Sequence, residues 1–325
     1  MKQPLKNKFP TEHRAYKIVI IGSGKVGTTF AYTLLLHGLI GEIALIDVDK
    51  ERTEGEVMDL NHAVPLVNPV RIYQGDYSDC QGADVVVITA GTAQRPGETR
   101  LDLLKRNIDI FKHIVPQIVQ YTREAILLVA TNPVDILSYA THKISGLPAA
   151  RVIGSGTVLD TSRFRWLLGQ YFSLDARNIH AFVIGEHGDS EVAVWSSANI
   201  AGTPLDAYCQ FIGCEISSSQ REEFTKQVCN AAYEIIQRKG ATFYAVAAGL
   251  ARIVESILRN QNSVLSVSNL VPGYYGIHDI YLSLPAVIGE HGINHILELP
   301  LSQSEEKALI QSADVLKNML DQLEI

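Results

Sequence analysis

The sequence predicts an α/β protein in which a doubly wound parallel sheet is followed by an α+β domain. Across the first half of the 325 residues, short apolar runs of strand length alternate with stretches of helix length. Runs that are apolar throughout are typical of parallel strands buried on both faces. Five strand-and-crossover units in series imply right-handed crossovers and a doubly wound sheet. Longer amphipathic stretches follow in the second half, so we expect two domains, residues 1–154 and 155–325.

The first strand, predicted at residues 17–21, ends in a glycine-rich turn. Gly22, Gly24 and Gly27 follow in the G-x-G-x-x-G spacing, and a helix is expected over residues 28–36. Gly22 permits the tight turn, Gly24 lets backbone approach a pyrophosphate, and Gly27 lets the helix pack closely on the strand. The amides at the start of that helix would point toward the phosphates. The turn therefore predicts a dinucleotide site in a Rossmann fold.

The second strand, predicted at residues 42–46, ends at Asp47, twenty residues after Gly27. A carboxylate at this place accepts hydrogen bonds from ribose hydroxyls and repels the 2′-phosphate of NADP. We therefore expect NAD as the cofactor. The alternative is a generic strand, turn and helix with an incidental aspartate.

The remaining elements of the first half follow the same alternation. A charged helix is expected over residues 50–60, and strands are predicted at residues 71–74, 83–90, 124–130 and 151–153. A longer helix, residues 101–121, contains Pro116, which should kink or divide it. The loop at residues 92–100 lies at the carboxyl end of a central strand, and ligands bind in the crevice beyond such ends.

Two apolar stripes at helical spacing stand out in the second half. One covers residues 224–235, with Gly240 beyond it as a C-cap, and the other covers residues 309–323, preceded by Ser304. Both are predicted to be core or subunit interface rather than functional surface.

Composition excludes several function classes. The net charge is −7 with both signs dispersed, so nothing predicts a nucleic-acid partner. The first fifteen residues lack the apolar segment of a secretion signal, and no apolar run is long enough to span a membrane. We therefore expect a soluble, cytoplasmic protein. The four cysteines have no C-x-x-C spacing and no histidine pair has ligand spacing, so no metal site is predicted.

Chemistry at a bound nicotinamide needs a proton donor and acceptor, which histidine supplies because its pKa lies near neutrality. Among ten histidines, His187 is singled out because glycines flank it and it follows a strand-like run, residues 181–184. Upstream, Asp160 and Arg163 would share one face of a helix. Taken singly, these residues also fit a structural ion pair and a loop histidine. His291 lies in a second Gly-Glu-His-Gly but lacks an Asp-x-x-Arg run upstream, so we expect it to be incidental.

These motifs occur in the order and spacing of the L-lactate and malate dehydrogenase family, which the chain resembles over nearly its whole length. The resemblance implies that protonated His187 gives a proton to the keto oxygen of the substrate, while Asp160 orients the imidazole and stabilises its charge. Arg163 would bind the substrate carboxylate through two parallel hydrogen bonds. Arg100 would polarise the carbonyl when its loop closes. The resemblance also assigns substrate-pocket positions to Asn132 and Thr242, and cofactor-lining positions to Val26, Arg52, Tyr77, Gly91, Asn132 and Ser155.

Gln94 is predicted to select the 2-hydroxy acid. It lies two residues before Pro96, where malate enzymes resemble one another in carrying arginine and where glutamine resembles the lactate pattern. A second carboxylate buried beside Gln94 would cost about 3–5 kcal/mol, whereas the methyl group of pyruvate needs no partner. We therefore expect pyruvate as the keto acid. The resemblance implies that the product is L-lactate and that the reaction stands at the end of fermentative glycolysis. The neighbouring Arg95 leaves malate dehydrogenase as the alternative, and bulkier 2-keto acids are a further one.

Arg165 and His180 predict a regulatory site. This chain resembles the bacterial lactate dehydrogenases that are activated by fructose 1,6-bisphosphate, which also carry arginine and histidine at these two places. Across a two-fold axis, two copies of each would form a cationic pocket for a bisphosphate. The resemblance thus implies an activated homotetramer. The alternative is an exposed arginine and an ordinary histidine.

Overall fold

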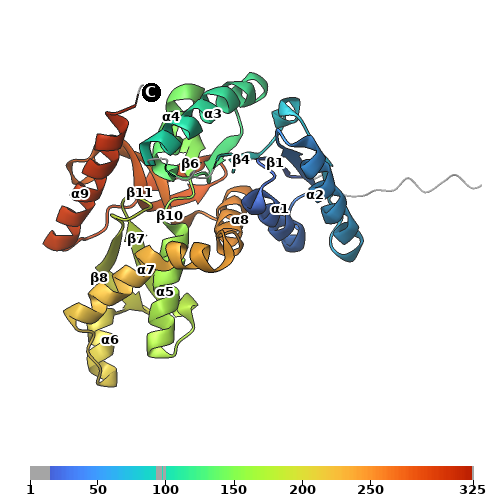
Figure 1. Ribbon diagram of the computed structural model, residues 1–325. Coiled ribbons are helices and arrows are strands. Elements are labelled where there is room, and N and C mark those ends of the chain that lie inside the picture. The colour runs from blue at the N-terminus through green and yellow to red at the C-terminus, as the bar shows by residue number, and fades with distance from the viewer. Residues whose placement is uncertain (1–14, 93–96, 98–99, 324–325) are drawn as a thin grey trace, which may run out of the picture.

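A computed structural model describes residues 15–92, 97 and 100–323. Six parallel strands form the predicted doubly wound sheet, in the order β6-β5-β4-β1-β2-β3 (Figure 1). Their bounds are β1 Lys17–Ile21, β2 Glu42–Ile46, β3 Arg71–Gln74, β4 Val85–Ile88, β5 Ile126–Val129 and β6 Val152–Gly154. The chain progresses outward from β1 in one direction and from β4 in the other, so a crevice opens at the carboxyl ends of these two central strands.

The helices of the first half lie close to the predicted ranges. They are α1 Lys25–His37, α2 Lys50–Ala63, α3 Arg100–Tyr121 and α4 Val134–Ser145. The predicted start of α1 was three residues late, because Gly24 is already its N-cap. Pro116 lies inside α3 and does not divide it. Buried Val115 and Ile118 flank the proline and keep the turns on both sides packed against the core.

The second half contributes both helices and strands. Its helices are α5 Val158–Phe172, α6 Leu205–Ile212, α7 Ser218–Lys239, α8 Tyr244–Leu258 and α9 Gln303–Leu320. Its strands are β7 Ile179–Ile184, β8 Val192–Ile200, β9 Thr203–Pro204, β10 Ser263–Pro272, β11 His278–Gly289 and β12 Gly292–Ile296. Short 3₁₀ helices cover Val64–Leu66, Tyr77–Cys80, Ala149–Arg151, Ala176–Asn178 and Tyr274–Gly276.

The sheet continues across the two predicted domains. Strand β10 pairs with β6 at Ser268 and Gly154, and β11 and β12 add to it antiparallel, so that nine strands form one sheet. Strands β7, β8 and β9 form a separate antiparallel sheet. The sequence did not locate β8 to β12. In β10, for example, the polar side chains of Ser266, Ser268 and Asn269 are buried, so hydropathy conceals the strand.

Helices cover both faces of the large sheet (Figure 1). One core contains Phe30 of α1 and Leu250 of α8, and these two helices also contact each other although they come from different halves of the chain. The opposite core contains Phe111 of α3 and Leu309 of α9. A third core, around Phe164, lies between α5 and the small sheet. The second half therefore forms part of both layers that position the crevice.

The two predicted helical stripes behave differently. Leu309, Ala313 and Leu316 of α9 are buried as predicted, and the helix is capped by Ser302 rather than by Ser304. In the stripe of α7, Val228 is buried, whereas Ile235 is 36% exposed. Helix α7 ends at the predicted C-cap, Gly240.

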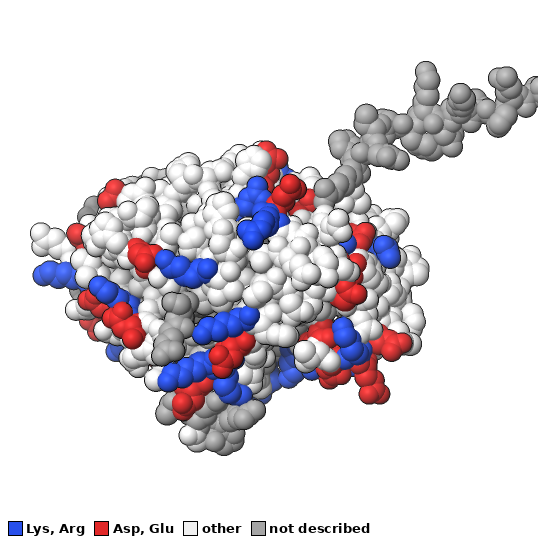
Figure 2. Space-filling model, turned by 90° about the horizontal axis from the view of Figure 1, so that it is seen from above, with Lys and Arg blue, Asp and Glu red and all other residues white. Residues whose placement is uncertain are grey.

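On the face drawn in Figure 2, acidic and basic side chains are interspersed over the surface. None of the helices in the described part of the chain combines the length and the apolar character needed to cross a bilayer.

Candidate active site

The glycine turn after β1 has the geometry of a dinucleotide seat. Gly22 has a φ of 109°, and a Cβ there would lie 2.6 Å from the backbone nitrogen of Ala90. A Cβ on Gly27 would lie 1.9 Å from the carbonyl oxygen of Gly22. Gly24 differs, because no described atom lies within 4 Å of the position of its Cβ. Packing therefore requires Gly22 and Gly27, whereas Gly24 leaves open the space at the start of α1 that a pyrophosphate would fill.

Asp47 is fixed at the end of β2 by groups on both sides of it. Its carboxylate accepts hydrogen bonds from the backbone N–H of Ser23 at 2.7 Å and of Asp49 at 3.0 Å, and Arg52 Nη2 lies 3.0 Å away. Burial raises the pKa of Asp47, but these hydrogen bonds and the Arg52 charge outweigh it and lower the pKa overall. Asp47 is therefore ionised and oriented where ribose hydroxyls would donate to it, which fits NAD.

The other predicted cofactor residues follow the carboxyl ends of strands of the parallel sheet. Val26 lies in the first turn of α1, Tyr77 begins the 3₁₀ helix after β3, and Gly91 follows β4. A Cβ on Gly91 would lie 2.4 Å from Cγ2 of Thr131, so this position also requires glycine.

A cavity of about 110 Å³ brings together residues predicted from separate parts of the sequence. Its lining includes five of them: Asn132, Ser155, Arg163, His187 and Thr242. Ala232 and Ile236 of α7 close one side. The C-terminal half of α7 therefore borders this cavity.

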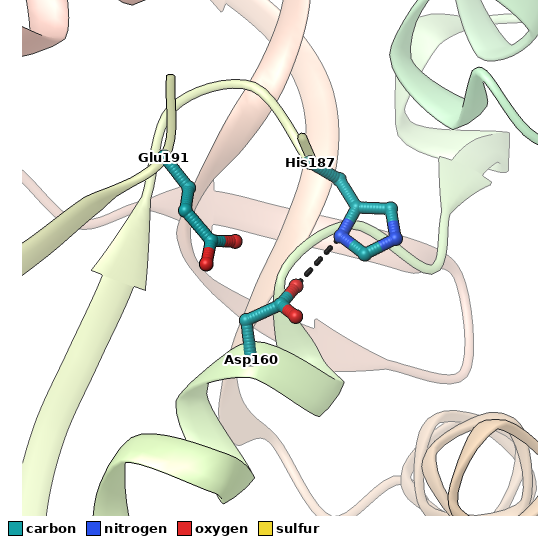
Figure 3. Close-up of side chains that lie close together, drawn as sticks. All are labelled: Asp160, His187 and Glu191. Carbon is teal, nitrogen blue, oxygen red and sulfur yellow. Dashed lines mark hydrogen bonds and ion pairs between the residues drawn. The ribbon is translucent and has the colours of Figure 1, made fainter. Parts of the chain in front are cut away.

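Asp160 holds both His187 and Arg163. Its side chain is 2% exposed, and its Oδ2 lies 2.6 Å from His187 Nδ1 (Figure 3). Its Oδ1 lies 2.6 Å from Arg163 Nη1. The predicted three-residue spacing on α5 thus places Asp160 and Arg163 together. The second ring nitrogen of His187 points away from Asp160 (Figure 3), and His187 lines the cavity, so this nitrogen could exchange a proton with a molecule bound there.

The electrostatics favour an ionised pair. Burial lowers the pKa of His187, but the charge and hydrogen bond of Asp160 outweigh it and raise the pKa to about 9. Burial raises the pKa of Asp160, but the interaction with His187 and Arg163 lowers it overall. At neutral pH, His187 is therefore an imidazolium that can donate a proton.

Three distant elements fix the loop that carries His187. The His187 backbone N–H donates to Asp135 Oδ2 of α4 at 2.8 Å, and the Glu186 N–H donates to Ser312 Oγ of α9 at 2.8 Å. Gly185 exchanges backbone hydrogen bonds of 2.9 Å with Ser283 of β11. The sequence analysis missed these supporting residues. Its one usable signal was Asp135, an acidic residue within an otherwise apolar start to α4.

Glu191 is a further residue that the sequence analysis missed. It is 8% exposed, and its carboxyl oxygen, an Asp160 oxygen and a His187 ring nitrogen all lie within 4.8 Å of one another. Such a group of atoms could hold a metal ion. However, the Asp160 oxygens already bind His187 and the Arg163 guanidinium, so the arrangement favours a cluster of charged side chains.

Two predicted substrate residues fall in or beside the part of the chain that is not described. Gln94 lies outside the described residues, and Arg100 begins α3 without a described side chain. His291 lines a different cavity from His187.

The predicted regulatory residues lie on adjacent elements, α5 and β7. Arg165 Nε donates to the carbonyl oxygen of Ala181 at 2.9 Å, and its guanidinium carbon lies 5.4 Å from the centre of the Phe182 ring. Burial lowers the pKa of Arg165. His180 is exposed on β7, next to Ala181.

Comparison with known proteins agrees with this geometry. The family described as "lactate/malate dehydrogenase, NAD binding domain" matches residues 16–154, and "lactate/malate dehydrogenase, alpha/beta C-terminal domain" matches residues 157–324. The chain is 56% identical over 310 residues to an L-lactate dehydrogenase of Acetivibrio thermocellus, covering 95% of this chain and 98% of that protein. It is 55% identical over 309 residues to one of Thermoanaerobacter pseudethanolicus, covering 95% and 99%. The crystal structure of the minor L-lactate dehydrogenase from Enterococcus mundtii in a ligand-bound form superposes with a TM-score of 0.93 at 41% identity, covering 96% and 99%.

Proposed function

The chain belongs to the lactate/malate dehydrogenase family, and from this we infer that it is an NAD-dependent L-lactate dehydrogenase with His187 as its proton donor and acceptor. One observation supports the assignment of His187 above all others. Its imidazole is bound to the buried carboxylate of Asp160 on one side and borders, on the other, the cavity that Arg163 also lines. A proton donor and a carboxylate-binding cation thus meet at one cavity.

The reaction follows from these side chains. NADH, when bound, supplies the hydride that reaches the keto carbon of pyruvate. His187 gives its proton to the keto oxygen and takes it back when L-lactate is oxidised. Asp160 stabilises the imidazolium and keeps its ring oriented. Arg163 binds the substrate carboxylate, Asn132 and Thr242 complete the pocket, and Arg100 polarises the carbonyl.

A His187→Asn variant tests the role of His187. Loss of the proton donor should lower kcat for pyruvate reduction by roughly 10²–10⁴-fold, while the Kd for NADH, measured by fluorescence, stays unchanged. In the wild type, kcat/KM for pyruvate should fall above about pH 9, because His187 must be protonated. Lactate oxidation needs neutral His187 and should rise toward the same pH. A variant that keeps its activity would refute the assignment.

We propose Gln94 as the residue that selects pyruvate over oxaloacetate. The alternative, malate dehydrogenase, depends on Arg95 reaching the pocket. Comparing kcat/KM for the two keto acids distinguishes them: pyruvate should be preferred in the wild type, and Gln94→Arg should move the preference toward oxaloacetate. A wild-type preference for oxaloacetate would favour malate dehydrogenase.

We also propose a cytoplasmic homotetramer that fructose 1,6-bisphosphate activates through Arg165 and His180. The half-buried guanidinium of Arg165 beside the strand that carries His180 supports this, since paired copies would offer several cations to two phosphates. Pyruvate saturation curves at slightly acidic pH, with and without the sugar bisphosphate, test it. We expect the sugar bisphosphate to activate the wild type and not to activate Arg165→Gln. Identical wild-type curves with and without the sugar bisphosphate would contradict the proposal. Size-exclusion chromatography with light scattering tests the tetramer.

A further inference from the structure

A second buried carboxyl group lies beside the His187–Asp160 pair. Glu191 directly precedes β8, and its carboxyl group faces the pair (Figure 3). A carboxyl oxygen of Glu191 lies within 4.8 Å of an Asp160 oxygen and of a His187 ring nitrogen. It is 8% exposed, and among the described residues no hydrogen-bond donor reaches its Oε1. A carboxyl group in this setting is costly to ionise unless a positive charge lies close to it.

The groups around Glu191 come from three elements. Asp160 and Arg163 face it from α5, His187 from the loop after β7, and the Cys229 thiol from α7. Burial and the Asp160 charge raise the pKa of Glu191, whereas the His187 charge lowers it, and the balance leaves the pKa at about 8. Asp160 and Arg163 keep their charges through turnover. His187 is therefore the neighbour whose charge changes during the reaction.

We propose that Glu191 is a positioning residue for the proton on His187: in alkaline solution it ionises while His187 is still an imidazolium, and it takes up a proton from solvent once His187 has given its own to the substrate. The attraction between the two charges raises the proton affinity of His187 before the reaction. Neutralisation of Glu191 afterwards prevents an excess negative charge in the buried cluster. When solvent returns a proton to His187, Glu191 releases one. Asp135 of α4 also faces His187 and contributes to its charge environment. Burial raises the pKa of Asp135 only to about 6, so it stays ionised in the alkaline range where Glu191 titrates.

This inference rests on the proposed role of His187, and Glu191→Gln tests it with the shape of the side chain preserved. Without the second carboxylate, the alkaline limb of kcat/KM for pyruvate should move to lower pH by about one unit, while the rate on the acidic side of the limb is largely kept. Glu191→Asp should restore most of the shift. Glu223→Gln is the matched control, since it removes the same charge from the exposed face of α7 and should leave the limb in place. An unshifted limb in a folded Glu191→Gln enzyme overturns the inference.

A second measurement does not depend on any change at Glu191. Infrared difference spectra of the full-length wild type, recorded across the same pH range, should show a protonated-carboxyl band that disappears near pH 8. In His187→Asn this band should persist to higher pH, because no imidazolium lowers the pKa. A band that titrates identically in both proteins overturns the inference. Full activity in His187→Asn would refute the proposed function itself, whereas an inactive His187→Asn with an unshifted limb in Glu191→Gln refutes the role of Glu191 alone.

Discussion

The two ends of the crevice are built in different ways. At the cofactor end, residues 22 to 52 supply the glycine turn, Asp47 and Arg52, and the contacts among them are mainly backbone to carboxylate. At the proton-transfer end, α4, α5, the loop after β7 and α9 meet, and the decisive contacts join buried charged side chains. At the cofactor end, the glycine turn provides the shape of the site and Asp47 provides one fixed charge. The proton-transfer end depends on ion pairs between buried side chains. Substitutions there should therefore lower kcat rather than weaken the binding of NADH.

Asp160→Asn should show the largest difference between an effect on turnover and an effect on NADH binding. An amide cannot stabilise the imidazolium or keep the ring tautomer, so kcat for pyruvate reduction should fall by about 10³–10⁴-fold. The Kd for NADH should not change, because Asp160 lies on α5, away from the glycine turn. Stopped-flow turnover and fluorescence titration measure the two quantities. Asp175→Asn, in an exposed ion pair with Arg177 beyond α5, serves as the control, and a loss of NADH binding in Asp160→Asn would break the comparison.

Arg163→Lys should have the next largest effect, in KM rather than in the affinity for NADH. Lysine keeps the positive charge but loses the planar fork, so one charged hydrogen bond of about 3 kcal/mol is lost, which corresponds to roughly 10²-fold in kcat/KM for pyruvate. Steady-state kinetics at saturating NADH measure it. An unchanged KM would mean that a different cation binds the substrate carboxylate.

The same contrast explains how far the sequence could predict the structure. Strands β1 and β2 have the predicted bounds, because a strand buried on both faces is a continuous apolar run and is therefore visible locally. Strand β3 also has the predicted bounds, although it lies at the sheet edge and only Ile72 in it is buried. Strand β10 was missed because buried polar residues such as Ser266 interrupt its apolar pattern. Such residues are stable in the core because they hydrogen-bond groups distant in sequence, as Ser266 does with the carbonyl oxygen of Val183.

The residues of the candidate site also fall into two groups, those that the sequence could predict and those that it could not. Asp160 and Arg163 were predictable together because helical spacing places them on one face. The G-x-G-x-x-G turn was predictable because each of its glycines meets a separate steric requirement. Nothing local marks Glu191 or Ser312 as parts of the site, because their partners are brought in by the fold. Asp135 shows the same limit: burial raises its pKa to about 6, but that burial is not visible in the sequence.

Asp47→Asn tests the opposite end and should have a smaller effect. The amide loses the charge that accepts from ribose hydroxyls, so the Kd for NADH should rise by about tenfold, equivalent to about 1.4 kcal/mol. Binding of NADPH should weaken less or improve, because repulsion of its 2′-phosphate is removed and Arg52 remains. The kcat at saturating NADH should stay within about twofold of the wild type. A large loss of kcat would show that the two ends are not independent.

Ser312→Ala should have the smallest effect and shows whether the proton-transfer end is held by one contact or by several. Ser312 is fully buried on α9, accepts a hydrogen bond from the Glu186 N–H and lies 3.0 Å from Ser190 Oγ. Its loss should leave that N–H unpaired and lower the free energy of unfolding by about 1–2 kcal/mol in urea.

The catalytic cost of Ser312→Ala should be modest, about threefold in kcat/KM for pyruvate, equivalent to about 0.7 kcal/mol. The reason is that Asp135 still accepts from the His187 N–H at 2.8 Å and Asp160 still holds the ring. Gln311→Ala, on the exposed side of the same helix, is the matched control and should change neither quantity. Ser312→Ala could instead lose as much activity as Asp160→Asn. In that case the position of the loop that carries His187, rather than the charge on Asp160, would limit catalysis. The difference between the two ends would then be explained by the rigidity of that loop alone.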